Sequence, residues 1–120
     1  MKYQLRFLSE AWDEWNELDK SIKIPLARKL EKRLEDPKIA SAQLHGKLIG
    51  LYKIKLSDSG YRLVYQVLDK EVVVLVISVG RRDKSKAYDL ARERIKKAPP
   101  NLYDFGGVNE NFNFYFLLLY

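Results

Sequence analysis

Hydrophobic positions change their spacing along the chain, and these changes predict the order of the structural elements. Residues 3–8 alternate between apolar and polar side chains, as in a short strand. Trp12, Trp15 and Leu18 then recur at helical spacing with acidic residues between them, which predicts an amphipathic helix. Large aromatic residues on one stripe of a helix usually bury their area, so we expect both tryptophans in the core and not on a base-stacking surface.

A second helix is predicted between a capping residue, Asp19 or Ser21, and Pro37, which ends it. Its apolar stripe repeats at intervals of four residues, at Leu26, Leu30 and Leu34. Its other faces are basic and carry Lys29, Lys32 and Arg33. Because only a short link joins the two helices, we expect them to form a helical hairpin after the first strand.

The second half of the chain predicts strands separated by tight turns, which together make an antiparallel meander. The strands are expected at residues 51–56, 61–68 and 72–80. The last of them is β-branched and apolar throughout, as in a central strand covered on both faces. With the N-terminal strand, the antiparallel sheet has about four strands, and a helix at residues 86–97 follows it. This order indicates an α+β domain with helices packed on the sheet.

Residues 98–120 break the pattern and are expected to lie outside a domain of residues 1–97. Pro99 and Pro100 stand near their start, and the residues after them are rich in asparagine and aromatic side chains, without helix-capping signals. The apolar end, residues 112–120, is too short to cross a membrane and is typical of a β-prone, self-associating segment. We interpret this tail as non-native or disordered, with a terminal strand or an oligomerisation segment as the alternative.

Composition narrows the class of protein. With 120 residues, 47% of them hydrophobic and 32% charged, the chain suits one globular domain with one core. Its net charge of +6 favours a polyanionic partner such as nucleic acid, although many small basic proteins have none. The absence of cysteine excludes disulfide scaffolds, thiolate zinc sites and cysteine nucleophiles. Because no signal peptide or run of about 20 apolar residues is present, we expect a cytoplasmic protein without membrane contact.

Three cations are expected close together on the outer face of the predicted sheet. Lys53 and Lys55 lie two residues apart on one strand, so their side chains share a face. If residues 57–60 form a four-residue turn, Lys55 stands opposite Arg62 on the next strand. Like charges in this arrangement destabilise a sheet, so we interpret them as a phosphate-binding platform. An ordinary solvated basic face is the alternative.

More cations follow the third strand of the meander, and a tyrosine comes soon after them. Arg81, Arg82 and Lys84 are expected at the same end or face of the sheet, depending on register, and Tyr88 follows one turn later. Nearby cations favour the ionised form of a phenol and the neutral form of an amine, which suits either group for proton transfer near neutral pH.

RNA cleavage without a metal ion needs three kinds of group. One takes the proton of the 2′-hydroxyl, one stabilises the charged phosphate of the transition state, and one protonates the departing 5′-oxygen. Arginine suits the second task through its bidentate fit to phosphate. The single histidine, His45, stands in a loop and is expected to make loop hydrogen bonds. The carboxylates show no spacing that predicts a metal cluster, so we expect no metal ion and no cofactor.

These residues resemble those of a known family. The stretch YKIKLSDSGYRLVYQVLDKEVVVLVISVGRRDKSKAY at residues 52–88, with LEDPKIASAQLHG at residues 34–46, is similar to the RelE toxins of bacterial toxin–antitoxin pairs. The resemblance extends over about residues 1–97. It implies a microbial RNase-like (RelE/ParE) fold and a ribosome-dependent endoribonuclease that cleaves mRNA in the A site of the small ribosomal subunit. It also implies a cognate RelB-like antitoxin as a partner.

The resemblance assigns catalytic roles to Lys53, Lys55, Arg62, Arg82 and Tyr88. It implies that the lysines and the tyrosine help to activate the 2′-hydroxyl, that Arg62 supports the charged phosphate, and that Arg82 helps to protonate the leaving oxygen. How the proton-transfer roles divide stays open. We expect the side chains of both arginines to be exposed.

Further contacts to RNA or the ribosome are expected from Arg81, Lys84, His45 and Lys47. Position 81 carries arginine where the family can carry lysine, and His45 stands where the family can carry arginine. These differences bear on ribosome contacts and codon preference more than on cleavage itself.

Two other functions stay open from the sequence. ParE-like toxins share this architecture and inhibit DNA gyrase, but they are not expected to combine the strand lysines with the tyrosine at position 88. A basic protein of this kind could also bind RNA or the ribosome without cutting, because a function depends on the geometry of its site and not on the fold.

Overall fold

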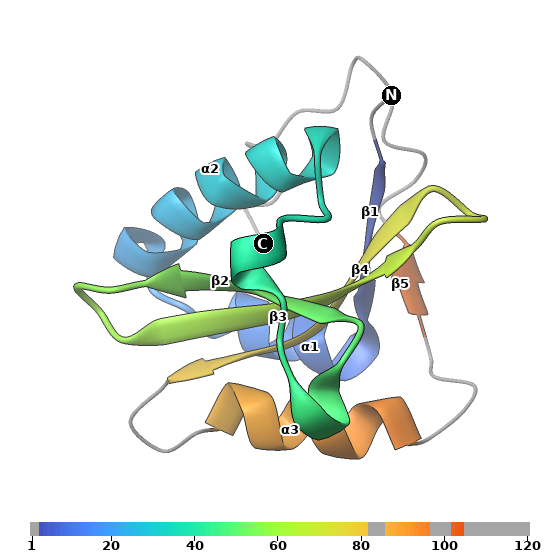
Figure 1. Cartoon of the computed structure of the whole chain (residues 1–120). Coiled ribbons are helices and arrows are strands. Elements are labelled where there is room, and N and C mark those ends of the chain that lie inside the picture. The colour runs from blue at the N-terminus through green and yellow to red at the C-terminus, as the bar shows by residue number, and fades with distance from the viewer. Residues whose placement is uncertain (1–2, 82–85, 97–101, 105–120) are drawn as a thin grey trace.

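The computed structural model of the chain describes residues 3–81, 86–96 and 102–104, and these build a sheet with helices on both faces (Figure 1). The strands are β1 (Gln4–Leu8), β2 (Leu51–Leu56), β3 (Tyr61–Leu68), β4 (Val73–Arg81) and β5 (Leu102–Asp104). The α-helices are α1 (Ser9–Asn16), α2 (Lys20–Glu35) and α3 (Lys86–Lys96), and two short 3₁₀ turns are η1 (Ala40–Ala42) and η2 (Gly46–Leu48). The strand order in the sheet is β2-β3-β4-β1-β5.

The apolar stripe and the N-cap of the second helix follow the prediction, while the first helix ends at Asn16, before Leu18. The Asp19 carboxylate caps α2 by accepting a hydrogen bond of 3.1 Å from the backbone N–H of Ser21, and the helix ends at Glu35, two residues before Pro37. On α1, Trp12 and Trp15 are buried and pack edge-on against Phe7 of β1, with ring centroids 5.3 and 5.7 Å apart. The prediction that both tryptophans belong to the core is therefore confirmed.

The meander is antiparallel as predicted, but the sheet as a whole is mixed. β2 pairs with β3, and β3 with β4, in antiparallel ladders. β1 lies parallel to β4, with Gln4 opposite Val73 and Phe7 opposite Val76, so the expectation of an all-antiparallel sheet is wrong. No hairpin joins β1 to β4, because two α-helices and two strands lie between them in the chain. A long connection of this kind allows two neighbouring strands to run parallel, whereas a tight turn does not.

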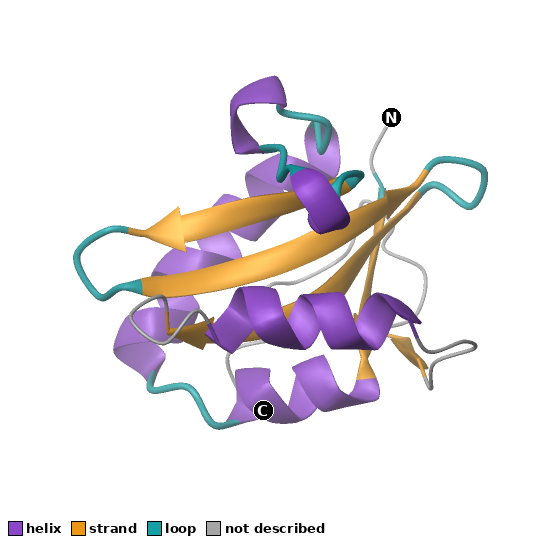
Figure 2. Ribbon diagram, turned by 60° about the horizontal axis from the view of Figure 1, so that its bottom comes forward, coloured by secondary structure: helices purple, strands orange, loops and turns teal. Residues whose placement is uncertain are grey.

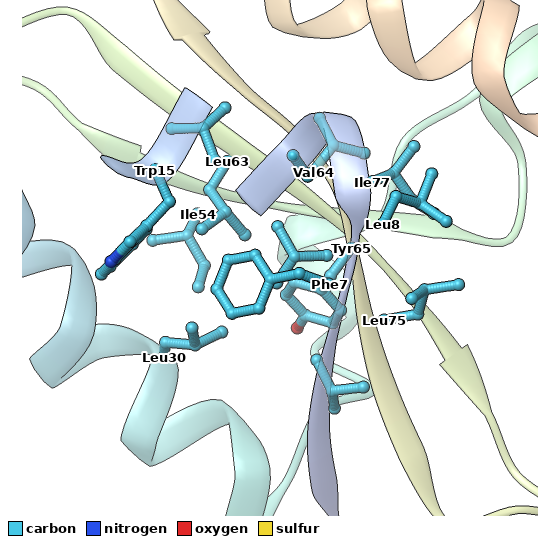
Figure 3. Close-up of a cluster of buried hydrophobic side chains, with 14 of the residues drawn as sticks. Phe7, Leu8, Trp15, Leu30, Ile54, Leu63, Val64, Tyr65, Leu75 and Ile77 are labelled. Atoms are coloured by element: carbon cyan, nitrogen blue, oxygen red, sulfur yellow. The ribbon is translucent and has the colours of Figure 1, made fainter. Parts of the chain in front are cut away.

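The main core lies between the sheet and the helices α1 and α2 (Figure 3). Phe7, Trp15, Leu30, Ile54 and Leu63 come from five different elements and are all fully buried there. β4 is buried from Val73 to Gly80, which confirms the prediction of a central strand covered on both faces. Figure 2 shows α3 on the other side of the sheet, where it packs on β3 and β4.

Part of the C-terminal segment extends the sheet. β5 pairs with β1 in antiparallel orientation, with Phe7 opposite Tyr103. The other residues of the segment, 98–101 and 105–120, lie outside the described part of the chain, so the proposed domain boundary after residue 97 stays a prediction. In the ranges 3–81, 86–96 and 102–104, no helix is long and apolar enough to cross a membrane.

Candidate active site

The β2–β3 hairpin places the predicted cations as its register requires. Ser57–Gly60 forms a four-residue turn, and Lys55 stands opposite Arg62 while Lys53 stands opposite Val64, as predicted. The backbone carbonyls of both lysines accept hydrogen bonds from α2, and thus face away from β3. These pairs therefore occupy the ladder positions where opposing side chains come closest. The lysine at position 55 is exposed and the one at position 53 is half-buried.

Arg62 was expected to be exposed, but it is buried, with only 6% of its surface exposed. Strand alternation puts its side chain on the face that α3 covers, and Gly80, its register partner on β4, has no side chain. One guanidinium nitrogen, Nη1, donates to the carbonyl oxygen of Tyr61 at 2.9 Å, which uses one of the five donors of the group. The expectation that Arg62 is exposed is therefore wrong, because strand alternation alone does not show how much of a face other segments cover.

Tyr88 reaches the same face of the sheet from α3. The Ser78 hydroxyl on β4 donates to the carbonyl oxygen of Ala87 at 2.6 Å and so holds the first turn of α3 against the sheet. Ser78 is the register partner of Val64, which is itself opposite Lys53. Tyr88 is half-buried and also packs against the core. Lys53, Lys55, Arg62 and the α3 turn of Tyr88 thus lie on one face of the sheet.

A partly buried ion pair that the sequence did not reveal holds α3 to the rest of the molecule. Arg94 of α3 makes two hydrogen bonds of 2.8 Å to the two carboxylate oxygens of Glu14 on α1. The side chains of these residues are only 10% and 20% exposed. Arg94 also donates to the carbonyl oxygen of Ile77 at 2.9 Å, and Glu14 accepts from the N–H of Val79 at 3.1 Å.

The Glu14–Arg94 pair also supplies hydrogen-bond partners to backbone groups at the edge of β4. The ladder between β1 and β4 ends at Val76, so no strand of the described part of the chain lies beside the outward backbone groups of Ile77 and Val79. Buried backbone groups need partners, and the pair supplies both. Because the two residues are 80 positions apart in the chain, no local spacing could have predicted the contact.

The structure describes only some of the remaining predicted site residues. Arg81 is opposite Tyr61 and on the other face from Arg62, with its guanidinium carbon 5.9 Å from the centre of the Tyr61 ring. It lies at the same end of the sheet as the predicted site, but not on the same face. His45 is exposed and directly precedes η2. Arg82 and Lys84 lie outside the described residues, and the side chain of Lys47 is not described.

Comparison with known proteins identifies the family. A family model described as the ParE toxin of type II toxin–antitoxin systems matches residues 5–86. A putative RelE-like toxin protein of Escherichia coli is 47% identical over 96 residues, which cover 80% of this chain and 100% of the relative. The mRNA interferase toxin RelE of E. coli K12 is 48% identical over 95 residues, or 79% and 99% of the two chains. The chain belongs to the RelE family of toxins.

Solved structures of RelE toxins agree with this assignment. A variant of E. coli RelE with two arginines replaced by alanine, solved in the free state, matches with a TM-score of 0.72 and 47% identity, covering 79% of this chain and 99% of that chain. The toxin of the intact E. coli RelBE toxin–antitoxin complex matches with a TM-score of 0.64 and 49% identity, covering 66% and 95%. The RelE-like α+β fold expected from the sequence is therefore confirmed.

Proposed function

We propose that this RelE-family chain is an endoribonuclease toxin that cleaves mRNA in the A site of the ribosome and is neutralised by a RelB-like antitoxin. The observation that carries the proposal is the 48% identity to a protein named mRNA interferase over 99% of that protein's length. The grouping of Lys53, Lys55 and Arg62 on one face gives this family likeness a chemical basis. We place the activity in the cytoplasm, where ribosomes and mRNA are found.

The proposed chemistry divides among the residues of this face and the segment that follows β4. Lys53, Lys55 and Tyr88 assist removal of the 2′-hydroxyl proton, and the 2′-oxygen then attacks the phosphorus. Arg62 stabilises the negative charge that develops on the phosphate, and its burial strengthens this effect because water screens the guanidinium less. Arg82 helps to protonate the 5′-oxygen that leaves.

Contacts outside the reacting phosphate orient the RNA. Arg81, Lys84, His45 and Lys47 are the proposed contacts to RNA or ribosome. Arg81 and His45 are both exposed, which allows such contacts.

The alternative functions differ in whether mRNA or DNA is damaged in the cell. A ParE-like toxin would inhibit gyrase, and a binding module would occupy the ribosome without cutting. Primer-extension mapping of mRNA from cells that express the chain distinguishes the three. Cuts inside translated codons support the proposal, whereas DNA damage without cuts indicates gyrase inhibition, and the absence of both indicates binding alone.

The chemical step is expected to proceed without a catalytic divalent metal ion, because the cations of the site can stabilise the phosphate charge themselves. Ribosomes need magnesium, so the test uses an mRNA with a phosphorothioate at the scissile position. Cleavage should not be restored by a thiophilic metal such as Mn²⁺ or Cd²⁺. Clear rescue at that phosphate would assign the chemistry to a metal ion.

Tyr88→Phe is expected to lower the single-turnover cleavage rate while ribosome affinity stays nearly unchanged. The substitution keeps the ring, and with it any stacking on a base, and removes only the hydroxyl. A loss confined to the rate marks an interaction made mainly in the transition state. Tyr88→Ala serves as the comparison, since it removes the ring as well. Equal rates for the parent and Tyr88→Phe would remove the tyrosine from proton transfer.

The antitoxin is expected to be acidic or amphipathic and encoded beside this gene, since such a segment can cover the cationic face or displace α3 with Tyr88. E. coli RelE has been solved in complex with a peptide of its antitoxin, RelB. Hydrogen exchange on the co-purified complex should show changed protection in β2, β3 or α3. If none of these elements changes, inhibition has to work by blocking ribosome entry.

A further inference from the structure

The outer edge of β2 is covered by side chains and a loop instead of another strand. β2 is the first strand in the sheet order, so among the described strands only β3 pairs with it along a full ladder. Leu44 donates its backbone N–H to the carbonyl oxygen of Leu51 at 2.9 Å. Arg33 Nη1 donates to the carbonyl oxygen of Lys53 at 3.0 Å, and Lys29 Nζ donates to that of Lys55 at 3.1 Å. Each outward carbonyl from position 51 to 55 thus has a donor.

The spacing of the two α2 side chains matches the strand. Lys29 and Arg33 are one helical turn apart, a rise of about 6 Å, and Lys53 and Lys55 are two strand residues apart, about 6.6 Å. A helix that runs antiparallel to the strand can therefore place one donor on each carbonyl. The two carbonyls that α2 holds belong to the two lysines of the proposed active site.

Arg33 is itself fixed by a second set of contacts. Its Nη1 also donates to the Tyr65 hydroxyl at 2.9 Å, and its guanidinium carbon lies 5.8 Å from the centre of the Tyr65 ring. The Tyr65 hydroxyl donates in turn to the carbonyl oxygen of Pro37 at 2.6 Å. Burial raises the pKa of the Tyr65 phenol, against the opposing effect of Arg33, so the phenol keeps the proton that it donates.

We propose that Lys29 and Arg33 are positioning residues, which hold the backbone of β2 so that Lys53 and Lys55 project toward the reacting phosphate beside Arg62. Arg33 has the larger effect, because it joins β2 to Tyr65 and Pro37, while Lys29 is exposed and makes one such contact. The expected effect on cleavage rests on the proposed function. Misplacing a reacting group by about 1 Å can slow a reaction by about 100-fold, so loss of Arg33 is expected to slow cleavage between about 10-fold and 100-fold.

The kinetic test compares Arg33→Met in two backgrounds. In the parent, the single-turnover rate at saturating ribosomes should fall, while the ribosome concentration at half saturation changes little. In Lys53→Ala, the same substitution should cause a much smaller further loss, because Arg33 acts through Lys53. Equal losses in both backgrounds would show a general structural effect and overturn the proposal. Lys32→Met removes the same charge from an exposed position of α2 and should leave the rate unchanged.

Hydrogen exchange tests the positioning without reference to cleavage. Arg33→Met should speed exchange of the β2 amides at residues 51–56 by about 10-fold or more relative to β4, whereas Lys32→Met should not. Unchanged exchange in β2 would overturn the proposal, whatever the kinetics. If the parent chain cuts no RNA on ribosomes, the proposed function fails, and the exchange result still decides whether α2 holds this strand.

Discussion

Arg62→Ala is expected to slow single-turnover cleavage of ribosome-bound mRNA by about 10²–10³-fold, the usual cost of removing one preorganised donor to a developing oxyanion. Arg62 is only 6% exposed and lies on the same face of the sheet as Lys53 and Lys55. Water therefore screens its charge only weakly, which strengthens its interaction with the phosphate. The rate measured with saturating ribosomes, and separately the ribosome affinity, tests this expectation.

Because Arg62 is buried, the alanine variant also loses packing, and its folding has to be checked by circular dichroism and thermal unfolding. The rates are then compared well below the melting temperature. Arg28→Ala, an exposed arginine on α2, is the matched control and should cleave at the parental rate. Arg82→Ala is expected to resemble Arg62→Ala by the same chemistry. A folded Arg62→Ala variant that cleaves like the parent would exclude Arg62 from the site.

Arg94→Met is expected to lower the free energy of unfolding by about 3 kcal/mol, because breaking a partly buried ion pair leaves the partner charge without compensation. Three contacts are lost with the guanidinium: two to the Glu14 carboxylate and one to the carbonyl oxygen of Ile77. We expect the low end of the usual range, since Glu14 is 20% exposed and keeps its bond to the Val79 N–H. Urea unfolding curves measure the change.

Arg92→Met provides the control for this prediction on the same helix. Arg92 lies 3.8 Å from Asp89 in an exposed pair one turn apart, and such pairs contribute less than about 1 kcal/mol. If Arg94→Met costs no more than Arg92→Met, the buried pair does not hold α3 to α1 and the edge of β4. A large loss for Arg94→Met alone supports the pair as the attachment of the helix that carries Tyr88.

The sequence predicted those parts of the fold that short-range patterns determine. The register of the β2–β3 hairpin follows from alternation and a four-residue turn, so the position of Lys55 opposite Arg62 could be stated in advance. The central strand β4 is recognisable because apolar residues occupy both of its faces. The caps and leucine stripe of α2 also follow local rules.

Features that depend on packing between distant segments could not be predicted. The parallel orientation of β1 depends on how the chain crosses back over the sheet. The burial of Arg62 depends on how distant segments pack over its strand, and the Glu14–Arg94 pair joins residues with no local relation in the chain. Arg33 looked like one cation on a solvated helix face, because nothing in its neighbours shows that it bonds a strand carbonyl.

The most direct test of the proposed activity uses purified chain and purified ribosomes stalled on a defined mRNA with a vacant A site. The account predicts a single cut inside the A-site codon, and none in the same mRNA without ribosomes. Since the 2′-oxygen attacks and the 5′-oxygen leaves, the upstream fragment should end in a 2′,3′-cyclic phosphate and the downstream fragment should begin with a 5′-hydroxyl. Intact mRNA on programmed ribosomes, or a downstream fragment with a 5′-phosphate, would contradict it.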